Sequence, residues 1–241
     1  QFGMLTTTQC AGLGPALLAS PSRGPSGLCT TTQIAALSAA GISGLETADM
    51  ATFDAADIAA ISNKALAGLS TANILALGSA QGAGLTTGQI AGLSSTQIGA
   101  LTSDEISGWD STQIAALAAK QMAALAMSAL SAAQVGMMTT GQVAGLSSAQ
   151  VTSLSTDQVA AWGTTQIAAL TSTGIAALET EDFATFDATE IAAISTSALA
   201  GLSTADISTL TNAQIDGFTS AQKQAMTTPQ LDAIIAAYYD V

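Results

Sequence analysis

The stretch LSSTQIGA, residues 93–100, contains the unit from which this chain is built. With Ser94 as a helix N-cap, Gln97 is the third helical residue, and Leu93 and Ile98 stand on either side of the first turn. These positions form a capping box and a hydrophobic staple. Hydroxyl and amide satisfy backbone N–H groups that a helix start leaves open, while the apolar pair fixes the entry of the chain. The octad therefore predicts the start of a short helix.

Large apolar residues, here called anchors, recur at every eighth position in two series. The first series is Leu37, Leu45, Phe53, Ile61, Leu69, Leu77, Leu85, Leu93, Leu101, Trp109, Leu117 and Leu125. The second series is Leu130, Met138, Leu146, Leu154, Trp162, Leu170, Leu178, Phe186, Ile194, Leu202, Leu210, Phe218, Met226 and Ile234. A repeat this short and regular indicates a solenoid, in which each unit buries its apolar side against its neighbours.

The other octad positions agree with capped helices. The caps are Thr30, Ser38, Asp54, Ser62, Ser70, Thr86, Ser94, Thr102, Asp110, Ser131, Thr139, Ser147, Ser155, Thr171, Asp187, Ser195 and Ser203. The box residues are Gln33, Asp49, Asp57, Gln89, Gln97, Glu105, Gln113, Gln121, Gln134, Gln142, Gln150, Gln158, Gln166, Asp182 and Glu190. The eighth position is usually Ala or Gly, which predicts a close approach of consecutive helices.

An eight-residue repeat can also be built from one long helix or from strands. In a continuous helix each octad would rotate the anchor by about 80°, so the apolar stripe would spiral around the surface. In a strand the anchor and the staple residue would face opposite sides. We therefore predict an all-α solenoid or superhelix of very short capped helices, whose stability comes from stacking. A β-solenoid with turns at the Ser-Thr pairs is the alternative.

A longer repeat lies above the octads. Residues 31–37 recur as residues 164–170, an offset of 133 residues that marks a duplicated module. Since this offset is not a multiple of eight, the register must change, and it does so between Leu125 and Leu130. The predicted regions are an irregular, capping N-terminal segment with two degenerate octads, 1–28, a first module, 29–129, and a second module, 130–241. The start at Gln1 also suggests a processed or partial product, a slice of a longer array.

The composition is that of an ordered, weakly charged protein. Of the 241 residues, 49% are hydrophobic and 9% are charged, and polar residues interrupt every apolar tract. We therefore expect a large core and no membrane insertion. The net charge of −13 argues against nucleic acid and against anionic membrane surfaces, because both are negative themselves. The expected partners are copies of the same chain, since weakly charged Ser, Thr and Ala faces repel each other little.

The two cysteines lie on pattern positions. Cys10 occupies a staple position and Cys29 an anchor position, so both side chains are expected to point inward. A disulfide between them would staple the Pro-containing segment 14–28, and in a secreted setting we favour this bridge over two buried thiols. Their spacing matches no redox or zinc motif.

Acidic residues cluster in the duplicated region. The matched acids are Glu46, Asp49, Asp54 and Asp57, and Glu179, Asp182, Asp187 and Glu190. Several carboxylates together are what a calcium site requires. All eight also occupy cap or box positions, and no calcium-loop motif is present, so we favour helix capping as their role.

We expect neither catalysis nor a cofactor. The chain has no histidine, and it contains no nucleophile elbow and no phosphate-binding loop. Trp109 and Trp162 fall on anchor positions, which predicts buried core residues. Lys223 and Gly82 occupy staple positions where an apolar side chain is expected, so their octads are predicted to be frayed, exposed or partner-facing.

A family resemblance adds to this interpretation. Residues 31–37, TTQIAAL, residues 93–100 and residues 164–170 resemble the Leu-Thr-Thr-x-Gln-Ile-Ala-Ala-Leu repeats of very large secreted bacterial surface proteins, described as adhesin-like or haem-utilisation proteins. The resemblance implies an extracellular or cell-surface location and a structural or spacer role. It implies no active-site residue, and no histidine is available as a haem ligand.

These observations together predict a structural protein, the self-assembling subunit of a bacterial surface filament or sheath. One alternative is an adhesin stalk or spacer that does not associate with itself. A second alternative is a flat ligand-binding solenoid of the ice-binding kind, suggested by the recurrent Thr residues. That second alternative is weakened because capping already uses the recurrent hydroxyls.

Overall fold

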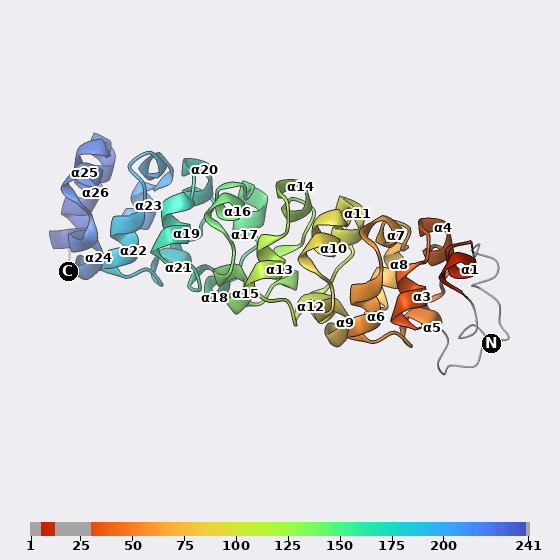
Figure 1. The fold of residues 1–241 in the computed structure, drawn as a ribbon. Coiled ribbons are helices and arrows are strands. Elements are labelled where there is room, and N and C mark those ends of the chain that lie inside the picture. The colour runs from red at the N-terminus through yellow and green to blue at the C-terminus, as the bar shows by residue number, and fades with distance from the viewer. Residues whose placement is uncertain (1–5, 13–29, 240–241) are drawn as a thin grey trace. The chain divides into compact units, whose positions relative to one another are not determined.

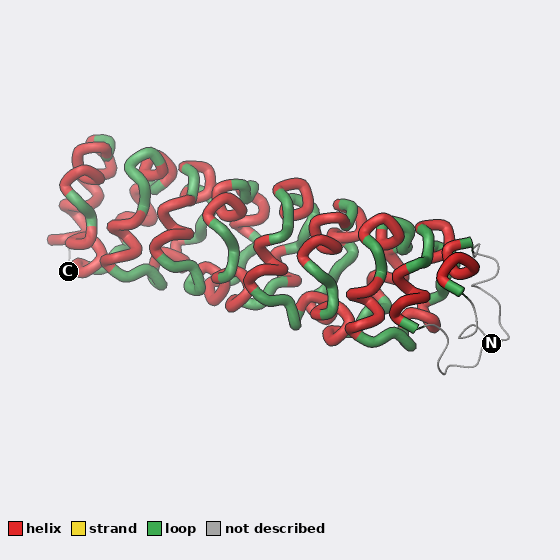
Figure 2. The backbone as a smooth tube through the Cα atoms, in the orientation of Figure 1, coloured by secondary structure: helices red, strands yellow, loops and turns green. Residues whose placement is uncertain are grey.

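The computed structural model describes residues 6–12 and 30–239, and every regular element within these ranges is a helix (Figures 1 and 2). Apart from the last one, the α-helices are only four to six residues long. The predicted all-α solenoid of very short helices is confirmed, and no strand supports the β-solenoid in the described residues.

The chain forms two compact units, Gln1–Ala129 and Leu130–Val241. The helices of the first unit are α1 (Thr7–Ala11), α3 (Thr31–Ala35), α4 (Ala39–Ile42), α5 (Thr47–Met50), α6 (Ala55–Ala60), α7 (Asn63–Leu66), α8 (Thr71–Leu75), α9 (Ser79–Ala83), α10 (Thr87–Gly92), α11 (Ser95–Gly99), α12 (Ser103–Ile106), α13 (Ser111–Ala115), α14 (Ala119–Met122) and the 3-10 helix η2 (Met127–Ala129). Between Leu125 and Leu130, where the octad register changes, η2 takes the place of an α-helical octad.

The second unit repeats this construction. Its helices are α15 (Ala132–Gly136), α16 (Thr140–Ala144), α17 (Ser148–Thr152), α18 (Thr156–Val159), α19 (Thr164–Ala169), α20 (Ser172–Ile175), α21 (Thr180–Phe183), α22 (Ala188–Ala193), the 3-10 helix η3 (Ala198–Gly201), α23 (Thr204–Ser208), α24 (Asn212–Gly217), α25 (Ser220–Ala225) and α26 (Thr228–Tyr239). Short loops connect them, as Figure 2 shows. These loops contain the anchor and the cap residue.

Three octads make one coil of each solenoid, because helices pack on the helix three octads later. In the first unit α3, α6, α9 and α12 form one column, α4, α7, α10 and α13 a second, and α5, α8, α11 and α14 a third (Figure 1). In the second unit α15, α18, α21, α23 and α26 follow the same rule, as do α16, α19, α22 and α24. The octad pattern alone leaves this number open.

Anchors and staples form the core. Leu93 and Ile98 are buried in the same way as their counterparts along both units. Phe53 is an anchor that remains half-buried. Trp109 and Trp162 are 3% and 1% exposed, so both lie in the core as predicted.

Glycine at the eighth octad position allows neighbouring coils to touch through their backbones. A Cβ atom at Gly68 would lie 2.2 Å from the carbonyl oxygen of Ala39, and one at Gly201 would lie 1.9 Å from that of Ser172. No side chain fits at such distances, so glycine is required at both positions. The predicted close approach is therefore made between coils rather than between consecutive helices.

The prediction that Gly82 marks a frayed, exposed or partner-facing octad is wrong. Gly82 is buried, and a Cβ atom there would lie 1.7 Å from the carbonyl oxygen of Glu105. The indole Nε1 of Trp109 donates a hydrogen bond of 3.0 Å to the carbonyl oxygen of Gly82. The next coil thus occupies the space that a side chain at Gly82 would need.

The last helix also departs from the octad pattern, which predicts a new start after the anchor Ile234. Instead, the 12 residues of α26 run through Ile234 without a break. Ile235 stands where other octads carry a capping residue, so nothing interrupts the helix there. In residues 6–12 and 30–239 we find no helix with the length and apolar character needed to span a membrane.

Candidate functional site

The predicted cap residues lie at helix N-termini. Ser94 Oγ accepts a hydrogen bond of 3.2 Å from the backbone N–H of Gln97, and Thr86 Oγ1 accepts one of 3.2 Å from that of Gln89. The same bond is made by Thr30, Ser38, Asp54, Ser62, Ser70, Asp110, Ser131, Thr139, Ser147, Ser155, Thr171, Asp187, Ser195 and Ser203. The side-chain oxygens at the cap position are therefore used by the helices of the repeat.

The box glutamine has a second role that the octad pattern did not reveal. In Gln97, Oε1 accepts from the backbone N–H of Ser94 at 2.9 Å, which closes the capping box. Its Nε2 donates to the carbonyl oxygens of Leu66 and Leu69, at 3.1 and 2.9 Å, in the preceding coil. One buried amide thus caps its own helix and binds that helix to the coil beneath it.

The same arrangement recurs along both units as a ladder of amides, which are buried except for the half-buried Gln81. Each of these side chains donates to carbonyl oxygens 28 to 31 residues earlier: Gln81, Gln89, Gln113, Gln121, Gln214, Gln222 and Gln230. A signal for this role was present in the sequence, because Gln outnumbers Glu at the box position although either residue can close a capping box.

Three buried box positions hold carboxylates, which accept hydrogen bonds but cannot donate them: Glu105, Asp182 and Asp206. Asp206 Oδ2 accepts from the backbone N–H of Ser203 at 3.0 Å, and Oδ1 accepts from the hydroxyl of Thr180 at 3.1 Å. Burial raises the pKa of Asp182, while hydrogen bonds from Glu179 and Thr156 act in the opposite direction. A neighbouring hydroxyl therefore replaces the amide-to-carbonyl bond at these two aspartates.

The calcium candidates lie in pairs, each pair at the start of one helix. Asp49 Oδ2 accepts from the backbone N–H of Glu46 at 2.9 Å, and Asp54 Oδ1 accepts from that of Asp57 at 2.9 Å. The second set is arranged in the same way: Glu179 with Asp182, and Asp187 with Glu190. Within residues 6–12 and 30–239 the structure brings together no group of three or more potential ligands.

The structure describes only part of the predicted N-terminal segment 1–28. Residues 6–12 contain α1, a capped helix in which Gln9 closes the box and Cys10 is buried. Cys29 and the Pro-containing stretch 14–28 lie outside the described residues, so the disulfide stays a prediction.

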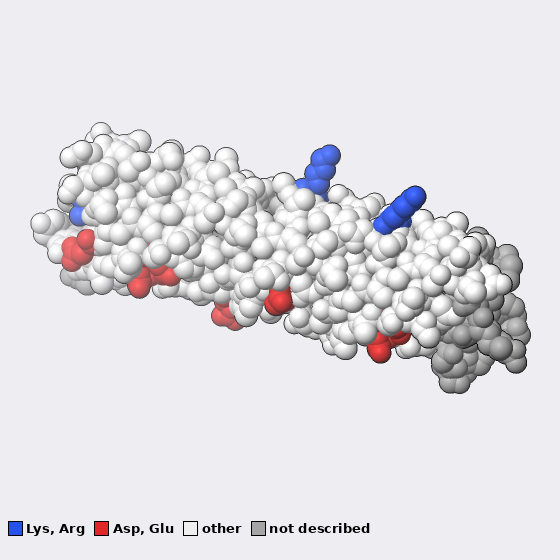
Figure 3. Space-filling model, viewed as in Figure 1, with Lys and Arg blue, Asp and Glu red and all other residues white. Residues whose placement is uncertain are grey.

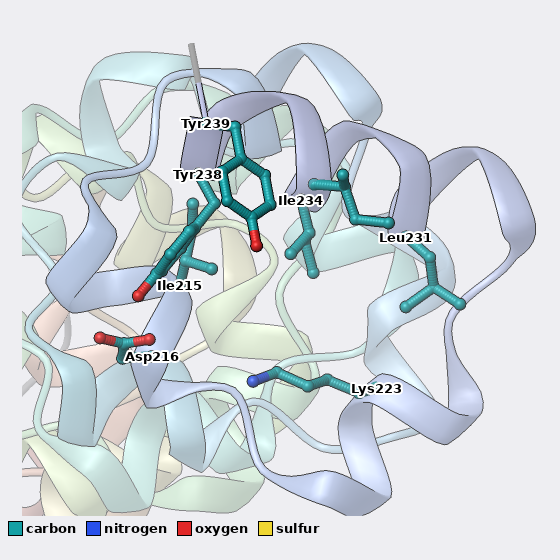
Figure 4. A pocket seen from close by; sticks show the side chains of 8 residues that line it. Ile215, Asp216, Lys223, Leu231, Ile234, Tyr238 and Tyr239 are labelled. Atoms are coloured by element: carbon teal, nitrogen blue, oxygen red, sulfur yellow. The ribbon is translucent and has the colours of Figure 1, made fainter. Parts of the chain in front are cut away.

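An open pocket of about 440 Å³ lies between α24, α25 and α26 (Figure 4). Its lining residues are Ile215, Asp216, Lys223, Leu231, Ile234, Ile235, Tyr238 and Tyr239. Lys223, predicted to interrupt the staple pattern, is half-buried, and its side chain lines this pocket. The lining is mainly apolar, with one acid and one base.

Comparison with known families identifies the repeat. The family model of the ALTTAQ repeat matches residues 50–87, 83–108, 143–172 and 175–212, in both units. A search of curated proteins found no match. The matched stretches cover more than half of the chain, which is therefore a repeat protein and belongs to the ALTTAQ repeat family.

Proposed function

We propose that the chain is a non-catalytic structural protein of a bacterial cell surface, the self-assembling subunit of a filament or sheath. One observation carries this proposal: the recurrent polar side chains of the octads serve the fold itself. The cap hydroxyl of Ser94 and the amide of Gln97 are both used in holding helices and coils together. A chain that commits its repeated polar groups to stacking suits a mechanical role.

The surface charge also supports association between copies. Most of the face seen in Figure 3 consists of uncharged residues, and few acidic or basic side chains are visible on it. The chain has only four Lys and Arg residues against 17 Asp and Glu. Uncharged faces avoid the repulsion that a net charge of −13 would otherwise produce between identical copies.

The bacterial and extracellular parts of the proposal rest on the resemblance to octapeptide repeats of large secreted surface proteins. The stretch TTQIAAL at residues 31–37 carries this resemblance, and it recurs at residues 164–170. A repeated scaffold suits the outside of a cell, where a spacer or sheath must extend without unfolding. Detection of the protein on intact cells by surface labelling tests this location, and a wholly intracellular protein would contradict it.

Negative-stain electron microscopy and light scattering of the purified full chain test self-assembly. We expect ordered fibres or sheets whose mass grows with protein concentration. Dispersed monomers at every concentration would contradict the filament and would favour a stalk or spacer that does not self-associate.

A further inference from the structure

The C-terminal helix α26 carries most of the large exposed apolar side chains in the described residues. Five such side chains are exposed in all, and three of them are Ile235, Tyr238 and Tyr239. Ile235 is 57% exposed and Tyr239 is 77% exposed. Apolar side chains that gather on one exposed surface mark an interaction site, and tyrosine is frequent among the residues that dominate binding energy.

These residues form one side of the pocket between α24, α25 and α26. In Figure 4 the rings of Tyr238 and Tyr239 and the side chain of Ile234 surround its interior, and Asp216 and Lys223 lie opposite the two rings. The two tyrosine rings meet edge to face, with centroids 5.6 Å apart. The surface is therefore apolar in the middle and charged at one side.

Two local changes distinguish this surface from the other octads of the second unit. Every other described octad helix of the second unit has an apolar staple, but α25 has Lys223 there. Ile235 replaces the cap residue, so α26 continues where a new octad would begin. A half-buried charge at Lys223 and an exposed apolar side chain at Ile235 therefore stand where the other octads have an apolar staple and a polar cap.

The charges of the surface favour an identical copy as its partner. No ion pair joins Asp216 to Lys223 within the part of the chain that the structure describes, although both line the pocket. In a contact with two-fold symmetry, the same surface of both copies takes part. Asp216 of each copy would then face Lys223 of the other, which gives two equivalent pairs. This balanced surface is unusual in a chain of net charge −13.

We propose that two copies associate through this surface, formed by α24, α25 and α26, about a two-fold axis. The apolar side chains of α26 pack against those of the second copy, and two Asp216–Lys223 pairs flank them. This inference rests on the proposed self-assembly and specifies one of its contacts.

Cysteine cross-linking of the full chain tests the geometry. Ala236→Cys places a thiol on the exposed side of α26, and Ala72→Cys places one on α8 as a matched control, since both alanines are exposed. We expect mild oxidation to give covalent dimers with Ala236→Cys in clear excess over Ala72→Cys and over the unaltered chain. Equal yields would overturn the two-fold contact.

A charge swap tests the chemistry of the same surface. Lys223→Glu should raise the dissociation constant of the dimer by about tenfold or more, and Asp216→Lys in the same chain should restore it. Lys120→Glu, with the same change of charge on α14, should have little effect. Failure of the second change to rescue association would overturn the pairing.

The two proposals can fail separately. Ordered fibres without Ala236→Cys cross-links would reject this surface and keep the proposed self-assembly. Cross-linked dimers without fibres would keep this surface and reject the filament.

Discussion

The octads of Gln97 and Asp206 occupy the same place in their coils, yet they join the coil beneath in different ways. Both side chains are buried and both accept a bond from their own cap residue. Gln97 also donates to two carbonyl oxygens of the preceding coil, whereas Asp206 has no amide N–H group and accepts a bond from Thr180 instead. Capping a helix requires only an acceptor, but bonding to the backbone carbonyl oxygens of the preceding coil requires a donor as well.

Asn73 shows that the amide group, rather than the length of the side chain, makes this difference. It is no longer than an aspartate, yet its Nδ2 donates to the carbonyl oxygen of Leu45 at 2.9 Å. Its backbone N–H also donates the cap bond, to Ser70 Oγ at 3.1 Å. An amide of either length can therefore connect two coils.

The largest expected effect comes from converting an amide position into a carboxylate position. Gln97→Glu keeps the capping acceptor and removes only the donor, which leaves the carbonyl oxygens of Leu66 and Leu69 facing a buried charge. We expect the free energy of unfolding to fall by about 3 kcal/mol at neutral pH. Urea denaturation measures this free energy, and Gln224→Glu, at an exposed position, is the control. Equal losses of stability in the two variants would contradict the role of Gln97 in joining the coils.

The reverse change should stabilise the protein. Glu105→Gln supplies a donor at a buried position, where the pattern places the carbonyl oxygens of Ile74 and Leu77 within its reach. We expect a gain of about 1 to 2 kcal/mol in the free energy of unfolding, seen as a higher urea midpoint. Glu181→Gln, at an exposed position, removes the same charge and should change the midpoint little. A Glu105→Gln variant no more stable than this control would refute the expectation.

The two tryptophans extend the comparison to an indole donor. Trp109 Nε1 donates to the carbonyl oxygen of Gly82, whereas Trp162 Nε1 is buried without a hydrogen-bond partner. Trp109→Phe loses a bond, and Trp162→Phe removes an unsatisfied group, while both lose similar apolar area. We expect Trp109→Phe to cost about 1 kcal/mol more in thermal or urea unfolding. The opposite ranking would show that the indole bond contributes nothing.

The smallest effect is a pH dependence at Asp182. Burial raises the pKa of this carboxyl above its ordinary 3.8, so the folded protein binds the proton at a higher pH than the unfolded chain does. Its contribution to the free energy of unfolding therefore increases as the pH falls from neutral toward 3.8. Asp182→Asn should be more stable than the unaltered protein at neutral pH, and this advantage should shrink as the pH falls toward 3.8.

Asp110 provides the control of opposite sign. Hydrogen bonds from the Thr112 side chain and from the backbone of Gln113 lower its pKa, so its contribution to stability is lost as the pH falls. Asp110→Asn should therefore be less stable than the unaltered protein at neutral pH, and the deficit should shrink on acidification. Parallel pH profiles for the two variants would contradict the assignment of Asp182 as a carboxyl that is penalised by burial.

Much of the fold could be predicted because the octad contains a complete local signal. Ser94, Gln97 and the apolar pair around them lie within six consecutive residues, so the helix start is specified by neighbours in sequence. The candidate site was predicted less completely. Whether Gln97 also binds Leu66 and Leu69 depends on which coil packs beneath its own. The carbonyl groups of these two residues lie 31 and 28 residues earlier in the sequence, outside the octad of Gln97.

Gly82 was misjudged for the same reason. Gly82 has no side chain of its own to indicate its environment, and only the position of Trp109 in the next coil shows why glycine is needed. The missing cap signal at Ile235 accounts for the length of α26, but which side of this helix is exposed depends on its packing against α23 and α24.

Helix starts, helix lengths and the identity of the buried positions follow from residues within one octad, since capping and staple contacts reach only a few positions along the chain. The number of octads per coil, the second hydrogen bond of each box amide and the glycines between coils were decided by three-dimensional stacking. Each of these depends on groups that lie about three octads apart, and a local pattern carries no information about which distant groups will meet.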